Sequence, residues 1–265
     1  TVSPRERNVV CRSRMRSVGE GPSAGMAPLV VADAAGAAAE VIVVSMTRGF
    51  RHQTIPLGIE TLRELSRESG AFRISSVDDF ARFTDDELAQ VGAIVFLSTT
   101  GELPMSEPQR QAMLRYIEQG GGFVGIHSAT DTFYGWAEYG EMIGAYFDGH
   151  PWNAGDTIPL KIDDPDHPAA KPWIDAERTF KEEIYQFRRP YDRAKLHVLL
   201  SLDVEKTDMR KSGIKRRDGD FALAWTKPHG QGRVFYTALG HNESVWKMPA
   251  FRAHLRAGIE QVLRR

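Results

Sequence analysis

Three histidines occupy comparable places in the sequence, each in a segment that follows a short apolar run. His127 directly follows Phe123–Ile126, and His52 comes shortly after Val41–Val44. His241 follows a third such run. Because ligands bind at the carboxyl ends of parallel strands, we expect the three imidazoles to share one crevice there. The alternative is that each histidine is a separate, hydrogen-bonded structural residue.

The stretch around His127 has the pattern of a tight turn between a strand and a helix. Three glycines, Gly120–Gly122, precede the apolar run, and the small residues Ser128 and Ala129 follow the histidine. In hydrolases, a G-x-S-x-G turn holds the nucleophile on such a corner. In this sequence, an imidazole stands where that nucleophile would be.

Further polar residues could complete a site with these histidines. Glu183 and Tyr185 alternate in a predicted strand, so they would share one face, and His150 lies in a Gly-His-Pro-Trp loop. Imidazole and carboxylate suit zinc, manganese or iron, and imidazole also transfers protons near neutral pH. The predicted metal ligands are His52, His127, His150 and His241, and the predicted catalytic residues are His127, His52, Glu183, Tyr185 and Asp131.

Arginine and aromatic residues near the histidines favour a sugar-like ligand. Arg48 and Arg51 flank His52 and could hold an anion or a polyol, and aromatic faces suit pyranose rings. The aromatic residues are equally compatible with a place in the core. Asp131 either orients His127 or caps a nearby helix. The predicted substrate-binding residues are Arg48, Arg51, Trp152, Tyr134 and Glu102.

The elements that would position these residues alternate between strand and helix in the first half of the chain. This alternation is typical of a doubly wound α/β fold. After Pro151 the pattern changes to strands with little helix between them, which predicts antiparallel additions to the sheet. The predicted strands are 41–44, 72–77, 93–97, 123–126, 157–162, 180–187, 197–202, 221–226 and 233–239, and the main predicted helices are 55–69, 106–119 and 249–263.

The composition is that of an ordinary globular protein. Of the 265 residues, 42% are hydrophobic and 26% are charged, and the net charge of −1 argues against nucleic acid or a membrane surface as a partner. The single cysteine, Cys11, excludes an internal disulfide and a cysteine metal cluster. Residues 1–39 are predicted to be a disordered leader, and 40–265 a single domain. We expect a cytoplasmic protein, and the sequence leaves a homo-oligomer open.

The sequence contains no phosphate-binding loop. Gly120–Gly122 precedes a strand and does not open a helix, so it lacks the context of a dinucleotide-binding motif. No nucleotide cofactor is therefore expected.

Several motifs, in one order along the chain, resemble the trehalose-utilisation (ThuA-like) family over about Val41–Arg265. Glu182-Glu183 stands where that family often has Asp-Glu, which leaves the second carboxylate in place. The motifs are Thr47-Arg48-Gly49-Phe50-Arg51-His52, Gly125-Ile126-His127-Ser128-Ala129-Thr130-Asp131, Gly149-His150-Pro151, Glu183-Ile184-Tyr185 and Gly232-Arg233-Val234-Phe235-Tyr236 through Gly240-His241-Asn242.

The resemblance implies a flavodoxin-like, mostly parallel sheet of the class I glutamine amidotransferase-like type. Amidotransferases of that type place a catalytic cysteine at the turn where this chain has His127. Because no cysteine follows Cys11, glutaminase chemistry is excluded. The resemblance also implies a bacterial protein of carbohydrate metabolism, with disaccharides such as trehalose and their keto forms as the substrate class.

The leading functional hypothesis is an enzyme that acts on a disaccharide or keto-glycoside. Oxidation at C3 acidifies the proton on C2, so a histidine base assisted by a metal could eliminate the glycosidic substituent. The alternative hypothesis is a non-catalytic sugar-binding or regulatory module. A metal-dependent amidase or deacylase is a third hypothesis, for which the sequence offers little.

Overall fold

A computed structural model describes residues 38–263 of the chain. Residues 1–37, which make up most of the predicted leader, lie outside the described residues. The helices are α1 (Ile55–Ser69), α2 (Asp85–Leu88), α3 (Glu107–Glu118), α4 (Ala137–Ile143), α5 (Glu243–Trp246) and α6 (Pro249–Val262). The strands are β1 (Ala39–Val44), β2 (Phe72–Val77), β3 (Val91–Leu97), β4 (Gly122–Ile126), β5 (Tyr146–Phe147), β6 (Thr157–Ile162), β7 (Thr179–Lys181), β8 (Phe187–Arg188), β9 (His197–Leu202), β10 (Ala222–His229) and β11 (Gly232–Thr237).

Nine of the strands in the described part of the chain form one sheet, in the order β2-β1-β3-β4-β11-β10-β9-β6-β7. The pairs from β2 across to β11 are parallel, as expected for strands joined by helical crossovers. The pairs from β11 across to β7 are antiparallel. The sheet is therefore mixed, and the expectation of a mostly parallel sheet holds only for its first half.

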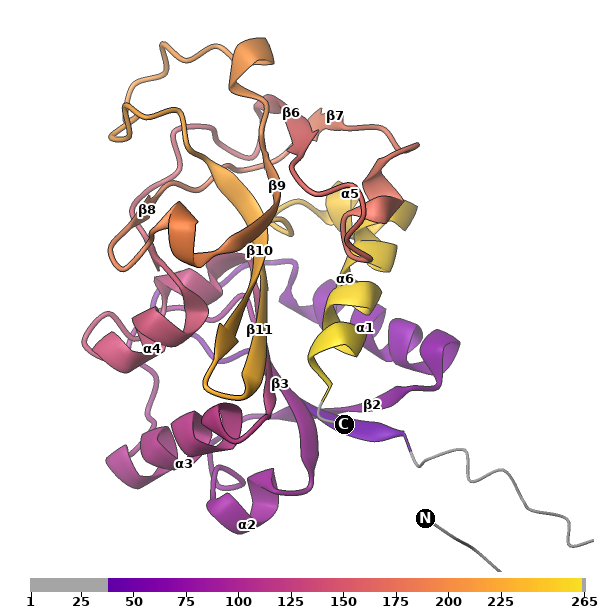
Figure 1. Ribbon diagram of the computed structural model, residues 1–265, viewed down its shortest axis with the longest axis vertical. Helices are drawn as coiled ribbons and strands as arrows, with labels where there is room; N and C mark the ends of the chain where they lie inside the picture. Colours follow the sequence, from indigo (N-terminus) through magenta and orange to yellow (C-terminus); the bar gives the residue numbers. More distant parts are fainter. Residues whose placement is uncertain (1–37, 264–265) are drawn as a thin grey trace, which may run out of the picture. The chain divides into compact units, whose positions relative to one another are not determined.

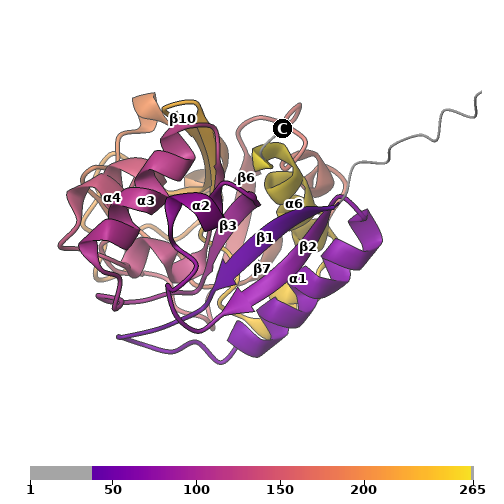
Figure 2. The same cartoon turned by 90° about the horizontal axis from the view of Figure 1, so that it is seen from below.

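Helices cover both faces of the parallel half (Figure 1). Helices α1 and α6 contact one face, while α3 and α4 contact β11 from the other. Figure 2 shows β1 and β3 between these two helical layers. Strand β3 is buried along its whole length, which explains its continuous apolar run.

Most predicted elements in the described range are confirmed within about two residues, but the strand predicted over 180–187 is wrong. The structure has β7 and β8 with an irregular segment between them, because backbone N–H groups there have other partners. Ile184 donates to the carbonyl of Trp152, and Gln186 donates to that of Gly149. This segment carries Glu183 and Tyr185 away from the sheet ladder.

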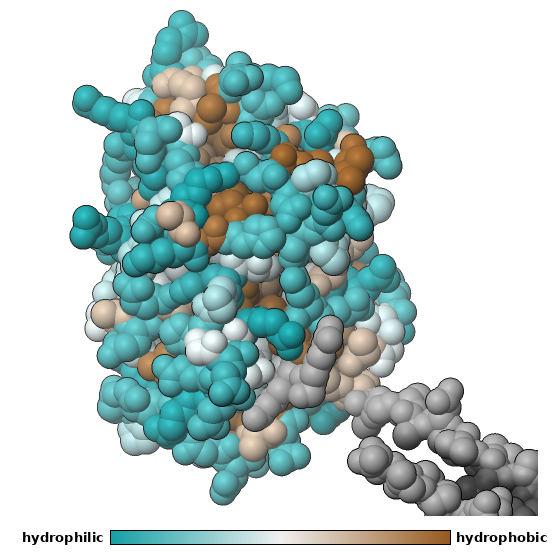
Figure 3. Space-filling view, in the orientation of Figure 1, coloured by the Kyte–Doolittle hydropathy of each residue, from teal (hydrophilic) through white to brown (hydrophobic). Residues whose placement is uncertain are grey.

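The face shown in Figure 3 is mostly hydrophilic and has separate hydrophobic areas. Within residues 38–263, no helix combines the length and apolar character that crossing a membrane requires.

Candidate functional site

Four side chains that are distant in sequence converge at the carboxyl edge of the parallel strands. His127 Nε2 lies 3.0 Å from His52 Nε2, 3.3 Å from His241 Nδ1 and 3.7 Å from Glu183 Oε2. Glu183 Oε2 also lies 3.1 Å from His241 Nδ1. One ligand atom from each of the four residues lies within 4.8 Å of all the others. The expected convergence of the three histidines is confirmed.

His127 sits on a strained turn directly after β4. Its φ is +54°, in the left-handed region that non-glycine residues seldom adopt. The carbonyl of His127 accepts a hydrogen bond from the buried Tyr236 hydroxyl at 2.7 Å, which holds the turn in place. A side chain at Gly125 would come within 2.9 Å of Ile143 and Tyr236, so this close approach requires glycine. The tight turn predicted around His127 is confirmed.

The hydrogen bonds of His127 define its tautomer. Nδ1 lies 2.8 Å from the carbonyl oxygen of Ala238, which can only accept, so Nδ1 carries the proton. Nε2 then has a single lone pair, and it faces His52 Nε2, His241 Nδ1 and, at 2.9 Å, the Tyr185 hydroxyl. One lone pair cannot accept hydrogen bonds from three donors.

A metal ion fits this donor set better than hydrogen bonds do. Ligands about 2.0–2.1 Å from a tetrahedral zinc ion lie roughly 3.3 Å from one another. The nitrogen–nitrogen distances of 3.0 Å and 3.3 Å around His127 Nε2 are close to that spacing. His52, His127, His241 and Glu183 are therefore the residues that could hold a divalent metal.

The electrostatics of the two buried histidines favour their neutral forms. Burial, with a smaller effect of neighbouring His241, lowers the pKa of His52 to about 4. Burial also lowers the pKa of His127 well below its usual value. The hydrogen bond to Glu183 raises the pKa of His241. His52 and His127 are therefore in the neutral form that binds metal.

A second carboxylate, not predicted from the sequence, positions two of the four residues. Glu182 is fully buried, and its Oε1 accepts backbone N–H groups of Glu183 at 3.0 Å and His241 at 3.1 Å. Its Oε2 accepts the N–H of Asn242 at 3.3 Å. Burial raises the pKa of Glu182 to about 7. The doubled Glu182-Glu183 was the available signal for this role, but the backbone partners are too distant in sequence to infer.

His150 lies at the rim of the site, outside the group of four. Its Nδ1 is 3.3 Å from Glu183 Oε1 and 3.1 Å from Asn153 Oδ1, and its side chain is 39% exposed. Both neighbours are acceptors, so Nδ1 carries the proton and Nε2 has the lone pair. His150 was predicted to be a direct metal ligand, but in the structure it lies outside the group of four converging residues.

The structure does not support an orienting role for Asp131 on His127, because Ala238 occupies His127 Nδ1. Asp131 instead accepts a 2.6 Å hydrogen bond from the Tyr134 hydroxyl. That hydroxyl also lies 3.1 Å from the carbonyl of Phe147, whose ring packs against Tyr185. Asp131 and Tyr134 thus lie behind Tyr185, one layer away from the four converging residues.

The remaining predicted substrate-binding residues have different locations. Arg48 and Arg51 are exposed on the loop that carries His52. Trp152 is only 2% exposed and packs against Phe221, so it offers no ring face to a ligand. Glu102 is exposed and accepts the backbone N–H of Gly135.

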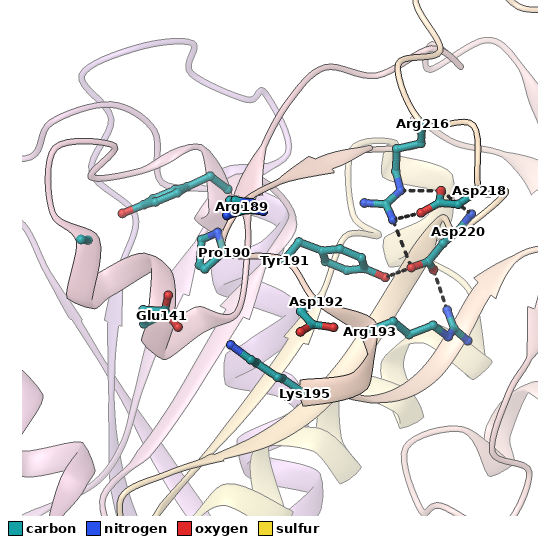
Figure 4. Close-up of a pocket in the computed structure, with 12 residues that line it drawn as sticks. Glu141, Arg189, Pro190, Tyr191, Asp192, Arg193, Lys195, Arg216, Asp218 and Asp220 are labelled. Carbon is teal, nitrogen blue, oxygen red and sulfur yellow. Dashed lines mark hydrogen bonds and ion pairs between the residues drawn. The ribbon is translucent and has the colours of Figure 1, made fainter.

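A cavity of about 750 Å³ lies in the antiparallel half of the molecule, and none of its lining residues belongs to the histidine site (Figure 4). Four of its charged side chains pair with one another. Asp220 accepts hydrogen bonds from Arg193, at 2.7 Å, and from Tyr191, at 2.8 Å, while Arg216 pairs with Asp218. The cavity therefore contains one self-paired group of charges, made by Arg193, Arg216, Asp218 and Asp220.

Comparison with known families finds one match over most of the chain. The model of the family described as "ThuA: Trehalose utilisation" matches residues 40–262. No curated protein matches at a significant level.

Solved structures with the same fold include two proteins described as ThuA-like. The protein from Bacteroides uniformis is 23% identical, with a TM-score of 0.66 over 90% of this chain and 94% of that chain. The protein from Parabacteroides merdae is 19% identical, with a TM-score of 0.62 over 85% and 90%. A protein described as cytoplasmic, from Salmonella typhimurium, is 13% identical, with a TM-score of 0.57 over 86% and 100%. At these identities the likeness shows the fold alone.

Proposed function

The chain belongs to the trehalose-utilisation (ThuA) family, and from this premise we propose that it is a carbohydrate-catabolic enzyme with a divalent-metal centre. The proposed ligands are His52, His127, His241 and Glu183, a donor set that suits zinc, manganese or iron. The observation that carries the proposal is the convergence of these four residues within 4.8 Å. The proposed substrate is a small sugar, a disaccharide or keto-glycoside.

A bound metal ion and two neighbouring side chains, Tyr185 and His150, have separate proposed roles in the reaction. A bound divalent ion would supply Lewis-acid polarisation of a substrate carbonyl oxygen. Burial raises the pKa of Tyr185 well above its usual value, so its hydroxyl stays protonated and can donate to a substrate oxygen. His150 has a lone pair on Nε2 and is partly exposed, so it is the proposed base.

The proposed reaction is elimination from a 3-keto-glycoside. His150 Nε2 takes the proton from C2, which the neighbouring C3 carbonyl has acidified. The C2–H electron pair forms a C1–C2 double bond as the glycosidic C1–O bond breaks. The leaving oxygen then receives the proton from His150. The products are a free sugar and an unsaturated keto-sugar, and no oxidant or water is consumed.

The test is incubation of the purified protein with 3-keto-trehalose and zinc, manganese or iron, followed by NMR. We expect release of glucose together with an unsaturated keto-sugar. Loss of the proposed base in His150→Ala should lower kcat by at least about 100-fold, while one zinc ion per chain is still bound. His197→Ala is the matched control, because His197 is an exposed histidine that pairs with Asp164.

Two results would count against this function. No turnover of 3-keto-trehalose with any of the three metals would remove the proposed elimination. If the wild-type chain binds a sugar tightly without turning it over, and His127→Ala binds it equally well, the non-catalytic sugar-binding module is favoured instead.

A further inference from the structure

One aromatic side chain beside the histidine site is strongly exposed. Phe50 is 65% exposed, and Ile174, at 45%, is the other large hydrophobic residue exposed within the described part of the chain. A single exposed apolar side chain is common and needs no functional explanation. Phe50 differs from that case in how its backbone is held and in what its ring contacts.

The buried Thr100, just beyond β3, fixes the backbone around Phe50. The Thr100 hydroxyl donates to the Phe50 carbonyl at 2.8 Å and accepts the N–H of Gly49 at 3.2 Å. The carbonyl of Thr100 accepts the N–H of Arg48 at 2.7 Å. A side chain at Gly101 would come within 3.0 Å of the backbone of Arg48 and Gly49, so this arrangement of hydrogen bonds requires glycine at position 101. The exposure of the Phe50 ring is therefore built into an ordered loop.

The Phe50 ring borders the proposed metal centre. Its centroid lies 4.8 Å from that of His52, with the rings at 78°. His52 in turn contacts His127 and His241. An apolar surface therefore reaches the solvent directly beside the proposed reacting groups.

We propose that Phe50 is the platform on which the sugar ring of the substrate stacks, a role that rests on the proposed function. The axial C–H groups of a pyranose make one face of the ring apolar, and an aromatic side chain complements that face. Phenylalanine has no hydrogen-bonding group, so it recognises the ring and not its hydroxyl pattern. The exposed Arg48 and Arg51 on either side of it in sequence supply donors for hydroxyl groups. The predicted substrate class is therefore pyranosides, with hydroxyl selectivity set by other residues.

The test measures trehalose binding to the zinc-loaded chain by calorimetry for Phe50→Ala, Phe50→Trp and Ile174→Ala. We expect Phe50→Ala to weaken binding about fivefold, because aromatic contacts have modest energies. Phe50→Trp should retain the affinity, and Ile174→Ala, which alters the other exposed apolar residue, should not change it. With 3-keto-trehalose, Phe50→Ala should raise KM and leave kcat nearly unchanged.

Several outcomes would overturn the platform. These are unchanged trehalose affinity in Phe50→Ala, no binding of trehalose or 3-keto-trehalose by the wild-type chain, or an altered oligomeric state in Phe50→Ala with unchanged sugar affinity. Zinc stoichiometry, measured on the same samples, reports separately on the metal centre. Sugar binding that depends on Phe50 without zinc binding would remove the proposed centre and keep the platform.

Discussion

The two halves of the sheet carry two polar clusters of opposite character. In the antiparallel half, Asp220 lies between Arg193 and Arg216, with ion-pair distances of 2.7 Å and 3.3 Å. At the edge of the parallel half, the lone pair of His127 Nε2 faces His52 and His241. The charges of the first cluster pair with one another, whereas in the second cluster three neighbours face one lone pair, which can accept only one hydrogen bond. Paired charges stabilise the fold around them, whereas lone pairs that converge on one point can bind a metal ion.

The topology explains why the clusters differ. Parallel strands end at the same edge, so the loops after β1, β4 and β11 meet there. Thr54 joins two of these loops, because its hydroxyl donates to the carbonyl of Gly240 at 3.2 Å. Antiparallel strands end at alternate edges, and their connections carry ion pairs between neighbouring segments.

The largest expected effect comes from removing the central imidazole. His127→Ala should lower zinc affinity by more than about 100-fold, because losing even an outer partner of a metal ligand costs 10- to 100-fold. Zinc titration calorimetry on chelator-treated protein would measure this change. His197→Ala is the control and should bind zinc like the wild type. Equal zinc affinity in the two variants would show that the converging lone pairs do not form a metal site.

A second test concerns the buried carboxylate that positions two ligands. Glu182→Gln keeps one accepting oxygen but replaces the other by an NH2 group, which cannot accept a backbone N–H, so the support of the ligands weakens and zinc affinity should fall by about 10- to 100-fold. Glu102→Gln is the matched control, since Glu102 is exposed and accepts one backbone N–H, that of Gly135, which is not a proposed ligand. If Glu182→Gln lowers the thermal stability of the metal-free chain but leaves zinc affinity unchanged, Glu182 has only a structural role.

A buried histidine outside both clusters provides a reference for pH dependence. His254 has Nδ1 2.6 Å from the carbonyl of Ala169, and burial lowers its pKa to about 4, with a smaller effect of His167. The unfolded chain binds this proton below pH 6.5 and the folded chain does not until about pH 4. Stability should therefore fall as the pH drops through that window, by about 2 kcal/mol at pH 5 for this group.

Denaturant unfolding of metal-free protein at pH 7 and pH 5 would test this dependence. His254→Phe should show the smaller loss of unfolding free energy between the two pH values, because its ring cannot titrate. If both proteins lose the same amount, the lowered pKa of His254 is wrong.

The smallest effect is expected in the self-satisfied cluster. Asp220→Asn weakens the contacts to Arg193 and Arg216 and should lower unfolding free energy by about 1 kcal/mol, since these pairs are partly exposed. Zinc affinity should not change. A loss of zinc binding in Asp220→Asn would show that the two clusters are not independent, which would break the comparison.

Much of the fold could be predicted from local patterns, because apolar runs and caps are local. The bounds of β2, β6 and α1 agree with those expected from the sequence. The segment between β7 and β8 could not be predicted, because its backbone partners, such as Trp152 and Gly149, lie more than 30 residues away in sequence.

The candidate site was predictable to a similar degree. The expectation that strands end at a common edge brings His52, His127 and His241 together. The partner of His127 Nδ1 is the Ala238 carbonyl, 111 residues away and without any side-chain signal, so the sequence could not choose between the two roles left open for Asp131. Phe50 and Glu182 depend on exposure and on non-local backbone contacts, which a single sequence does not contain.

X-ray absorption spectroscopy of the zinc-loaded wild-type chain tests the central claim most directly. We predict a zinc ion whose first shell contains three imidazole nitrogens and a carboxylate oxygen, at about 2.0–2.2 Å, and one further exchangeable oxygen, because polarisation of a substrate oxygen requires an open coordination position. A zinc ion surrounded by water oxygens, or one without the outer-shell scattering of imidazole rings, would contradict the account.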